Sequence, residues 1–136
     1  MAFRTSVPVR FGDVDYAGIV FYPKFFIYFH EAFEQFFEDA RISYERLLAE
    51  RRVSFPTVHI EVDYKAPLTY GDRLDLEVTV AKLGKRSATF RYAGYRHADG
   101  KHAVTALITT ACVDMNRFAA IDIPDDLRAL FERFSS

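Results

Sequence analysis

The sequence predicts an α+β domain in which an antiparallel sheet packs against one long helix. Residues 22–40 repeat apolar side chains at helical spacing, whereas much of residues 58–115 alternates apolar and polar side chains as strands do. The pair Asp99-Gly100 is typical of a tight two-residue hairpin between consecutive antiparallel strands. A helix followed by a run of strands favours a layout in which the helix covers one face of the sheet.

The predicted long helix, residues 22–40, has a very wide apolar face. Its apolar side chains at spacings of three and four are Phe25, Phe26, Phe29, Ala32, Phe33, Phe36, Phe37 and Ala40. The acidic residues Glu31, Glu34, Glu38 and Asp39 occupy the narrow remainder. Pro23 suits the first helical position, where its missing N–H would have had no partner. We therefore expect this helix to be largely buried.

The other elements are predicted from the spacing of apolar residues and from the positions of turn residues. A short helix over residues 43–51 has Ser43 as its expected N-cap. Half-buried strands are predicted over residues 58–65, ended by Pro67, and over residues 73–80. Residues 87–97 and 102–115 form the predicted hairpin, and the second strand, apolar on both faces, is expected in the middle of the sheet. A terminal helix runs from Pro124 to Arg133.

Composition excludes several classes of function. The 136 residues, 50% hydrophobic and 27% charged, predict a single domain over residues 1–136. A net charge of −1 provides no basic field for nucleic acid. No apolar run approaches the roughly 18 residues of a membrane span, and no signal peptide is visible. The only cysteine, Cys112, cannot form an intramolecular disulfide and is expected in the core, so we expect a cytoplasmic protein.

The histidines show no spacing that would hold a metal, so no metal site is expected. One helix cannot cover both faces of the predicted sheet, and apolar surface is left over. A second copy is the simplest cover for it. We therefore expect a homo-oligomer, either a dimer or a dimer of dimers, which would be a homotetramer.

The segment VRFGDVDYAGIVFYP, residues 9–23, carries the most specific chemical signal. It resembles the active-site motif of the 4-hydroxybenzoyl-CoA thioesterase family, in which an acid precedes small residues including Gly, an apolar pair, and a Tyr or His at the start of a helix. The matching residues are Asp15, Ala17, Gly18, Ile19, Val20, Tyr22 and Pro23. The order of elements extends the resemblance over nearly the whole chain. It implies a hotdog fold, a sheet wrapped around one buried helix, and hydrolysis of an acyl-CoA thioester.

Thioester hydrolysis needs a nucleophile or base and donors for the developing oxyanion. Asp15 can attack the thioester or deprotonate a water, and the residues do not choose between these routes. The structural alternative for Asp15 is an Asx turn or a helix cap. Asp13, two residues earlier, is expected to be a loop hydrogen-bonding residue, because the family pattern places the catalytic acid immediately before the small residues.

The start of the long helix is the expected electrophilic element. Backbone N–H groups near Tyr22 lack intrahelical acceptors and would polarise the thioester carbonyl. Tyr22 either lines the acyl site or packs on the sheet. Gly18 is expected where a Cβ would collide with the acyl group, and Val20 belongs to the apolar pair of the motif.

Aromatic residues of the long helix are candidates for an acyl pocket or for plain core: Phe25, Phe26, Phe29 and Phe33. His30 stands where the resemblance places an acid at the far end of the pocket in hydroxyaryl-specific members. This departure counts against 4-hydroxybenzoyl specificity, and the structural alternative is a core histidine satisfied by a neighbour. We select Phe26 and His30 as candidate substrate-binding residues.

Lys85, Arg86 and Ser87 occupy a predicted turn, where the resemblance implies contacts with the phosphates of coenzyme A. The alternative is a solvated basic turn.

The residues and the resemblance together predict an acyl-CoA thioesterase that needs no cofactor, since coenzyme A is part of the substrate. The alternative is a non-catalytic module that binds acyl-CoA or acyl carrier protein. A dehydratase is disfavoured because neither Val20 nor Tyr22 supplies the histidine of that chemistry. Aliphatic and aromatic acyl groups remain equally open.

Overall fold

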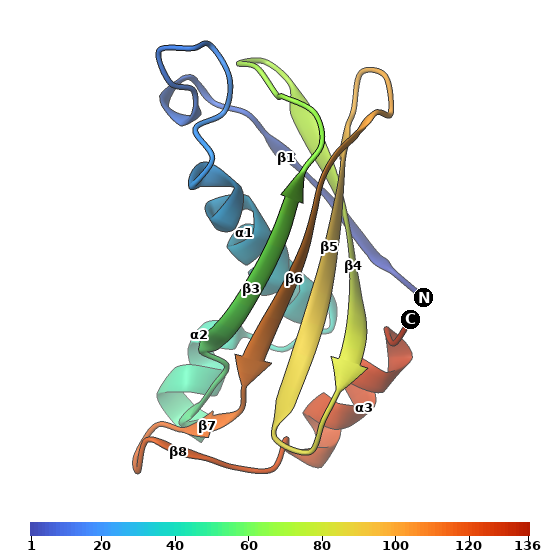
Figure 1. Cartoon of the computed structure of the whole chain (residues 1–136). Coiled ribbons are helices and arrows are strands. Elements are labelled where there is room, and N and C mark those ends of the chain that lie inside the picture. Colours follow the sequence, from blue (N-terminus) through green and yellow to red (C-terminus); the bar gives the residue numbers. More distant parts are fainter.

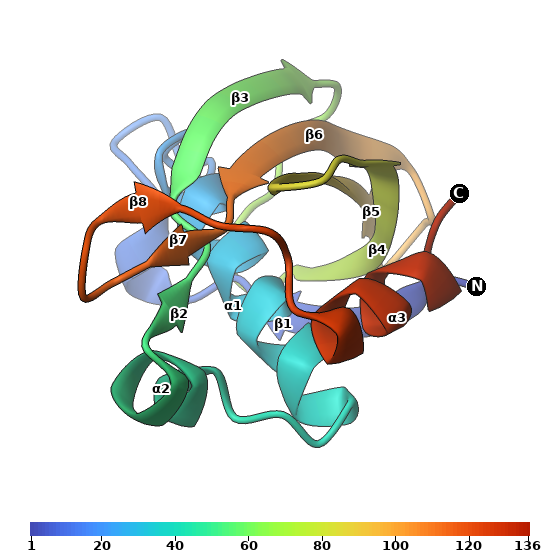
Figure 2. The same ribbon diagram turned by 90° about the horizontal axis from the view of Figure 1, so that it is seen from below.

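The computed structural model describes residues 1–136 and contains a curved antiparallel sheet of five strands in the order β1-β4-β5-β6-β3 (Figure 1). The strands are β1 (Phe3–Pro8), β3 (Thr57–Tyr64), β4 (Arg73–Leu83), β5 (Ser87–Arg96) and β6 (His102–Ala111). The sheet wraps around helix α1 (Lys24–Asp39), as the view along the strands shows (Figure 2). This confirms the predicted sheet around one long helix.

Shorter elements close the ends of this sheet. They are η1 (Phe11–Asp13), α2 (Tyr44–Arg46), η2 (Leu47–Arg51), β2 (Val53–Ser54), β7 (Val113–Asp114), β8 (Ala119–Ala120) and α3 (Asp125–Arg133). Strands β2, β7 and β8 form a separate small sheet. Ser43 accepts the Arg46 N–H at 3.2 Å, as its role of N-cap predicts. The predicted second helix, however, becomes a π-helical turn after Arg46.

Helix α1 is buried because its aromatic residues fill the concave side of the sheet. Phe29 and Phe37 have no exposed surface, and Phe36 has 1%. Phe36 contacts Phe90 of β5 edge-on, and Phe90 does the same to Phe131 of α3, at centroid distances of 5.8 and 5.3 Å. Such edge-to-face pairs add about 0.5–1.5 kcal/mol each to the burial of their area. The aromatic cluster therefore joins both helices to the sheet.

The central position predicted for the strand after the hairpin is confirmed, because β6 pairs with β5 on one side and β3 on the other. Its predicted length was wrong. The Cys112 N–H donates to the Arg86 carbonyl, and the Cys112 carbonyl accepts the Ile121 N–H. Residue 112 therefore leaves the main ladder, and the chain continues into β7 of the small sheet.

The strand predicted over residues 58–65 corresponds to β3, and the prediction that it is half-buried was wrong. Strand β3 is exposed at seven of its eight positions, because it is an edge strand whose outer side has no neighbour in the chain. Among its side chains, Val62 packs against the core, and the exposed Tyr64 contacts Phe25 edge-on with ring centroids 5.3 Å apart.

The predicted two-residue hairpin turn is a wider loop. Residues 97–101 separate β5 from β6, and only Gly100 has a positive φ, of 70°. The Arg96 guanidinium holds the Asp99 carboxylate at 2.8 Å, and Asp99 also accepts the Lys101 N–H at 3.1 Å. These side-chain bonds stabilise the wider loop in place of a type I′ turn.

None of the helices is both long enough and apolar enough to cross a membrane.

Candidate active site

The segment between β1 and α1 forms a small hairpin that presents the motif. Val14 pairs with Val20, the Asp15 N–H donates to the Ile19 carbonyl at 3.0 Å, and the Gly18 N–H returns to the Asp15 carbonyl at 2.9 Å. Gly18 has φ +84° with open space around its missing Cβ. Within this chain, the left-handed backbone explains the glycine, rather than the close approach that the sequence suggested.

Asp15 is exposed at the tip of this hairpin. Its Oδ1 accepts the Ala17 N–H at 2.8 Å, which is an Asx turn, so the structural alternative is present in the molecule. Its Oδ2 has no hydrogen-bond partner in the chain. One oxygen thus fixes the orientation of the carboxylate while the other is open to a water or a substrate.

Asp13 lies on the same hairpin in a different environment. It accepts the Arg10 N–H at 2.9 Å and the Tyr28 hydroxyl at 2.8 Å. Burial of Tyr28 and its bond to Asp13 hold the pKa of the phenol well above its usual range. Asp13 therefore ties the hairpin to α1, as expected for a loop hydrogen-bonding residue.

The start of α1 is less rich in free N–H groups than the sequence suggested. Lys24, Phe25 and Phe26 donate to the carbonyls three residues earlier, at 2.8–3.2 Å. The N–H of Tyr22 has no acceptor in the chain and is the one donor that this turn leaves available. The Tyr22 side chain is exposed, and its carbonyl accepts the Tyr64 hydroxyl at 3.4 Å.

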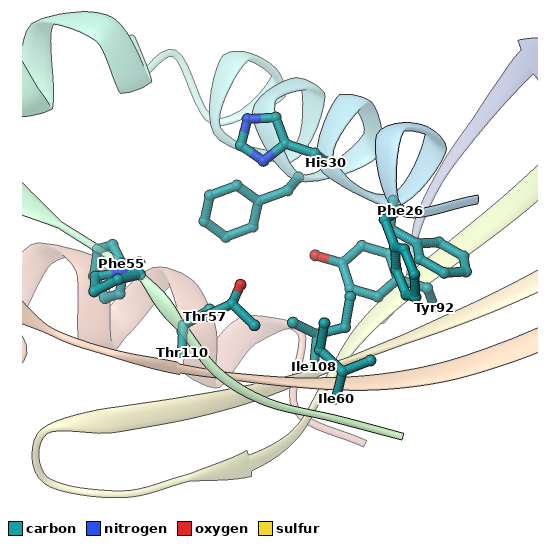
Figure 3. Close-up of a pocket in the computed structure, with 11 residues that line it drawn as sticks. Phe26, His30, Phe55, Thr57, Ile60, Tyr92, Ile108 and Thr110 are labelled. Carbon is teal, nitrogen blue, oxygen red and sulfur yellow. The ribbon is translucent and has the colours of Figure 1, made fainter. Parts of the chain in front are cut away.

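A cavity of about 310 Å³ lies between α1 and the concave face of the sheet (Figure 3). The structure brings Phe26, His30 and Phe33 of α1 together here, opposite Tyr92 and Thr110 of the sheet. Seven of its eleven lining residues are hydrophobic. This composition suits an apolar or aromatic group.

A second cavity of about 370 Å³ adjoins the hairpin at the N-terminal end of α1. The motif residues Val20 and Tyr22 line it together with Phe25 and Tyr64. Asp15 and Gly18 line neither cavity, although Ile19 of the same hairpin does. The hairpin that carries the carboxylate thus borders an apolar hollow, and the carboxylate itself is not part of the lining.

His30 is not the core residue of the structural alternative. Its side chain is 61% exposed, and its Nε2 lies 3.3 Å from a Glu34 carboxylate oxygen. The ring stacks on Phe33 with centroids 5.9 Å apart. His30 therefore forms part of the rim of the first cavity, because the polar stripe of α1 faces outward there.

The basic turn is remote from the hairpin within one chain. Lys85 and Arg86 lie in the turn between β4 and β5, and Ser87 begins β5, at the opposite end of the sheet from the Asp15 hairpin (Figure 1). The Arg86 Nε donates to Asp122 at 2.8 Å, and the Lys85 Nζ lies 3.9 Å from the same carboxylate. These cations, the Arg86 bond foremost, lower the pKa of Asp122.

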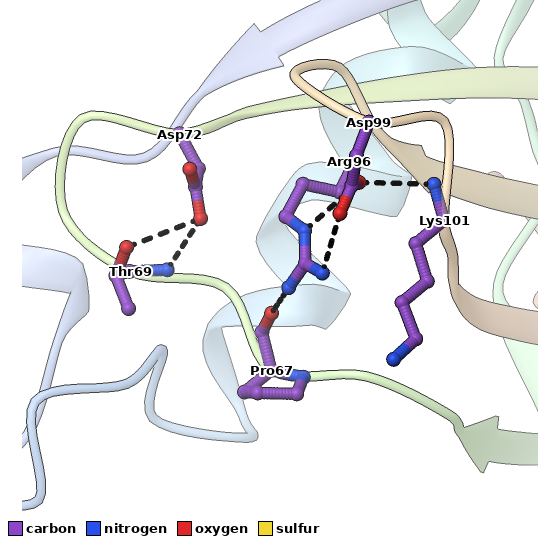
Figure 4. A network of polar contacts seen from close by, with 6 residues as sticks. All are labelled: Pro67, Thr69, Asp72, Arg96, Asp99 and Lys101. Atoms are coloured by element: carbon purple, nitrogen blue, oxygen red, sulfur yellow. Dashed lines mark hydrogen bonds and ion pairs between the residues drawn. The ribbon is translucent and has the colours of Figure 1, made fainter.

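Two features were missed by the sequence reasoning. The first is Tyr92, whose hydroxyl points into the first cavity (Figure 3). The alternation of side chains along β5 indicates only that this residue faces inward. Arg96 donates to the Pro67 carbonyl at 2.8 Å and holds the connection between β3 and β4 (Figure 4). The next carbonyl, of Leu68, accepts the Val20 N–H at 2.9 Å, so this connection supports the motif hairpin. No sequence signal links residues this far apart.

Cys112 is fully buried, and burial raises the pKa of its thiol to about 11. Such a thiol is protonated near neutral pH and is a poor nucleophile. No three His, Cys, Asp or Glu side chains gather as a metal site would require.

A sheet wrapped around one long aromatic helix is the hotdog fold, which the thioester hydrolases similar to this chain also adopt. The family model of the thioesterase-like superfamily matches residues 9–131, and the chain belongs to this superfamily.

Relatives and solved structures agree with this assignment. The chain is similar to a 1,4-dihydroxy-2-naphthoyl-CoA hydrolase of Nostoc punctiforme, with 29% identity over 93% of this chain and 84% of the relative. An enzyme of the same name from Synechococcus elongatus is 37% identical, over 57% of each chain. The crystal structure of a thioesterase superfamily protein from Jannaschia sp. CCS1 is 28% identical and superposes with a TM-score of 0.92, covering 99% of this chain and 94% of that one.

Proposed function

We propose that the protein hydrolyses an aromatic acyl-CoA thioester, with Asp15 as the catalytic carboxylate. The observation that carries the proposal is the Asx turn, which orients this carboxylate and leaves Oδ2 free on a hairpin that borders an apolar cavity. The relatives named above are 1,4-dihydroxy-2-naphthoyl-CoA hydrolases, which supports a hydroxylated aromatic acyl group. The resemblance to the 4-hydroxybenzoyl-CoA thioesterase family itself stays a prediction.

Two routes use the same carboxylate. In the first, Oδ2 attacks the thioester carbon, the coenzyme A thiolate leaves, and water hydrolyses the resulting mixed anhydride. In the second, Asp15 takes a proton from a water that attacks the carbon directly, and the thiolate again leaves. In both, we propose the Tyr22 N–H as a donor to the developing oxyanion. Neither route needs a metal or a cofactor.

We propose that the complete active site forms between two copies of the chain. The apolar side chains of β3 are exposed along a free edge, and Asp15 lies outside both cavities of its own chain. Antiparallel pairing of β3 with a two-fold related copy places the Thr57 end of one strand beside the Tyr64 end of the other. Thr57 lines the first cavity and Tyr64 the second, so such a dimer joins the acyl cavity of one subunit to the motif hairpin of its partner.

We further propose that Lys85, Arg86 and Ser87 contact the phosphates of coenzyme A in this oligomer. Arg86 and Lys85 share one carboxylate, that of Asp122, so the turn keeps a net positive charge. A dimer of dimers is the larger assembly that we propose.

The first experiment measures thiol release from aliphatic, benzoyl and hydroxylated aroyl-CoA thioesters. Asp15→Asn keeps an oxygen that can accept the Ala17 N–H but removes the charge, so kcat should fall about 100-fold or more. Asp39→Asn, an exposed acid at the C-terminal end of α1, is the matched control and should hydrolyse like the wild type. Wild-type rates in Asp15→Asn would overturn the role of Asp15.

The bond from Ala17 to Asp15 also fits a second candidate function, a non-catalytic acyl-CoA or acyl carrier protein binding module in which Asp15 only shapes the turn. Calorimetry with benzoyl-CoA distinguishes the two. Binding without thiol release, equal in the wild type and in Asp15→Asn, would establish the binding module.

A further inference from the structure

Tyr92 of β5 presents a hydroxyl group to the first cavity. The residue is 2% exposed, and its hydroxyl makes no hydrogen bond within the chain. No fully enclosed side-chain nitrogen or oxygen in the structure lacks a partner, so this oxygen must open into the cavity rather than lie sealed in the core. Figure 3 shows it pointing into the space between α1 and the sheet.

Apolar side chains form most of the surroundings of this hydroxyl, and none of the polar residues that line the cavity accepts its proton within the chain. The Tyr92 ring packs against Phe29 with centroids 5.2 Å apart, and Ile108 lines the same wall. Thr110, the buried polar residue nearby on the cavity wall, already uses its proton on the Ala88 carbonyl at 3.1 Å. A donor that the chain leaves without a partner destabilises the folded protein, and phenylalanine at this position would avoid that cost.

We propose that Tyr92 is the specificity-determining residue of the acyl cavity, where its hydroxyl donates a hydrogen bond to an oxygen carried on the aromatic ring of the acyl group. This rests on the proposed function. Phe26 and Phe33 contribute flat aromatic surfaces to the lining of the cavity, and such surfaces favour contact with a planar ring. Because Thr110 has spent its proton, its oxygen can accept only, so a ring hydroxyl satisfies both partners while a bare ring satisfies neither.

Burial raises the pKa of Tyr92 far above its usual range, so the phenol stays protonated and acts as a donor over the range in which the enzyme would work. A site built to bind a substrate hydroxyl discriminates strongly against the analogue that lacks it, because the polar groups of the site are then left unpaired.

The test compares kcat/KM for hydroxylated benzoyl-CoA isomers with that for benzoyl-CoA. In Tyr92→Phe, the preference for the favoured hydroxylated isomer over benzoyl-CoA should fall about 10-fold, the equivalent of one hydrogen bond. Tyr95→Phe is the matched control, since Tyr95 lies on the same strand and stacks on His102 on the opposite face of the sheet. It should keep the wild-type preference. Melting temperatures verify that both variants fold.

A second readout separates this inference from the proposed function. Calorimetry measures the binding of free hydroxybenzoates and benzoate to the wild type and to Tyr92→Phe. If the wild type hydrolyses no thioester but binds hydroxybenzoate with a preference that Tyr92→Phe loses, the proposed function fails and the role of Tyr92 holds. If hydrolysis proceeds with the same preference in the wild type and in Tyr92→Phe, the role of Tyr92 is overturned and the proposed function stands.

Discussion

Asp13 and Asp15 show how the same residue type, two positions apart, acquires different chemistry from its hydrogen bonds. The Asp13 carboxylate accepts hydrogen bonds from the Tyr28 hydroxyl and from a backbone N–H, so it has a structural role in the hairpin. In Asp15, one carboxylate oxygen accepts the hydrogen bond of the turn and the other has no partner in the chain. Catalysis by a carboxylate requires such a free oxygen with a fixed direction.

At the same scale, the basic turn can be tested by removing both of its cations. Lys85→Ala with Arg86→Ala should raise KM for acyl-CoA about 10-fold and change kcat less, because phosphate contacts act equally in the ground and transition states. Steady-state kinetics provide both constants. Arg117→Ala is the control, since Arg117 is also an exposed cation that pairs with one carboxylate, that of Asp114. An unaltered KM in the double variant would show that these cations do not bind coenzyme A and that the turn is a solvated basic turn.

The buried thiol of Cys112 predicts a dependence of stability on alkaline pH. Its pKa rises from 9.0 to about 11 in the folded protein, so between these values the unfolded chain loses a proton that the folded chain keeps. The free energy of unfolding should therefore fall as pH rises above 9. Tyr28 and Tyr92, whose pKa values are also raised by burial, should steepen the fall above pH 10.

Urea unfolding at pH 8.0, 9.0 and 10.0 measures this dependence. Cys112→Ala should be less stable than the wild type at pH 8 because it opens a small cavity, yet its stability should fall less between pH 9 and 10. Parallel pH profiles for the two proteins would contradict the assignment to Cys112.

Among the elements, the connection between β3 and β4 has a structural role that its irregular backbone conceals. Arg96 joins the Pro67 carbonyl to the Asp99 loop, and the Asp72 carboxylate accepts the Thr69 N–H at 2.8 Å within the same connection (Figure 4). The Leu68 carbonyl between these bonds accepts the Val20 N–H. The connection thus positions the returning arm of the motif hairpin.

Arg96→Lys should loosen this arm, because an ammonium group cannot make the three contacts of the planar guanidinium at once. Hydrogen exchange at the Val20 amide should accelerate on the order of 10-fold. Lys101→Ala is the control: Lys101 takes part in this network through its backbone N–H alone. If the Val20 amide of Arg96→Lys exchanges at the wild-type rate, the motif hairpin does not depend on Arg96 for its stability.

For the whole molecule, the distribution of apolar surface decides how copies of the chain associate. Exposed apolar side chains lie on β3 and on the N-terminal half of α1, including Val58, Ile60, Tyr64 and Ile27. A free edge strand with apolar side chains is prone to pair with another chain. The proposed dimer covers this edge and supplies each site with its second wall.

Val58→Lys should convert the dimer to monomers, because it places a charge among the apolar side chains of the proposed interface. Val58 is 62% exposed in the single chain, so the substitution should leave the fold intact. Sedimentation velocity measures the mass, and thiol release should fall together with it. Thr79→Lys, a substitution on the outward face of β4, should remain a dimer. A dimeric and active Val58→Lys protein would contradict pairing through β3.

Local patterns predicted much of this molecule, since helical spacing of aromatics and strand alternation are direct consequences of backbone geometry. The long helix, the antiparallel strands, the Ser43 cap and the terminal helix all follow from residues close in sequence. The motif before the helix also pointed to Asp15, and its Asx turn is a local structure that Asp and Gly favour.

What depends on residues distant in the sequence was decided only by the tertiary structure. Strand order made β3 an edge and exposed its apolar side chains, and Arg96 widened the hairpin by binding Asp99. The cavity under α1 exists because two distant segments curve around one another, and this places the Tyr92 hydroxyl inside it. Alternation along a strand predicts that such a side chain points inward, but only the packed molecule determines whether it meets core or an open space.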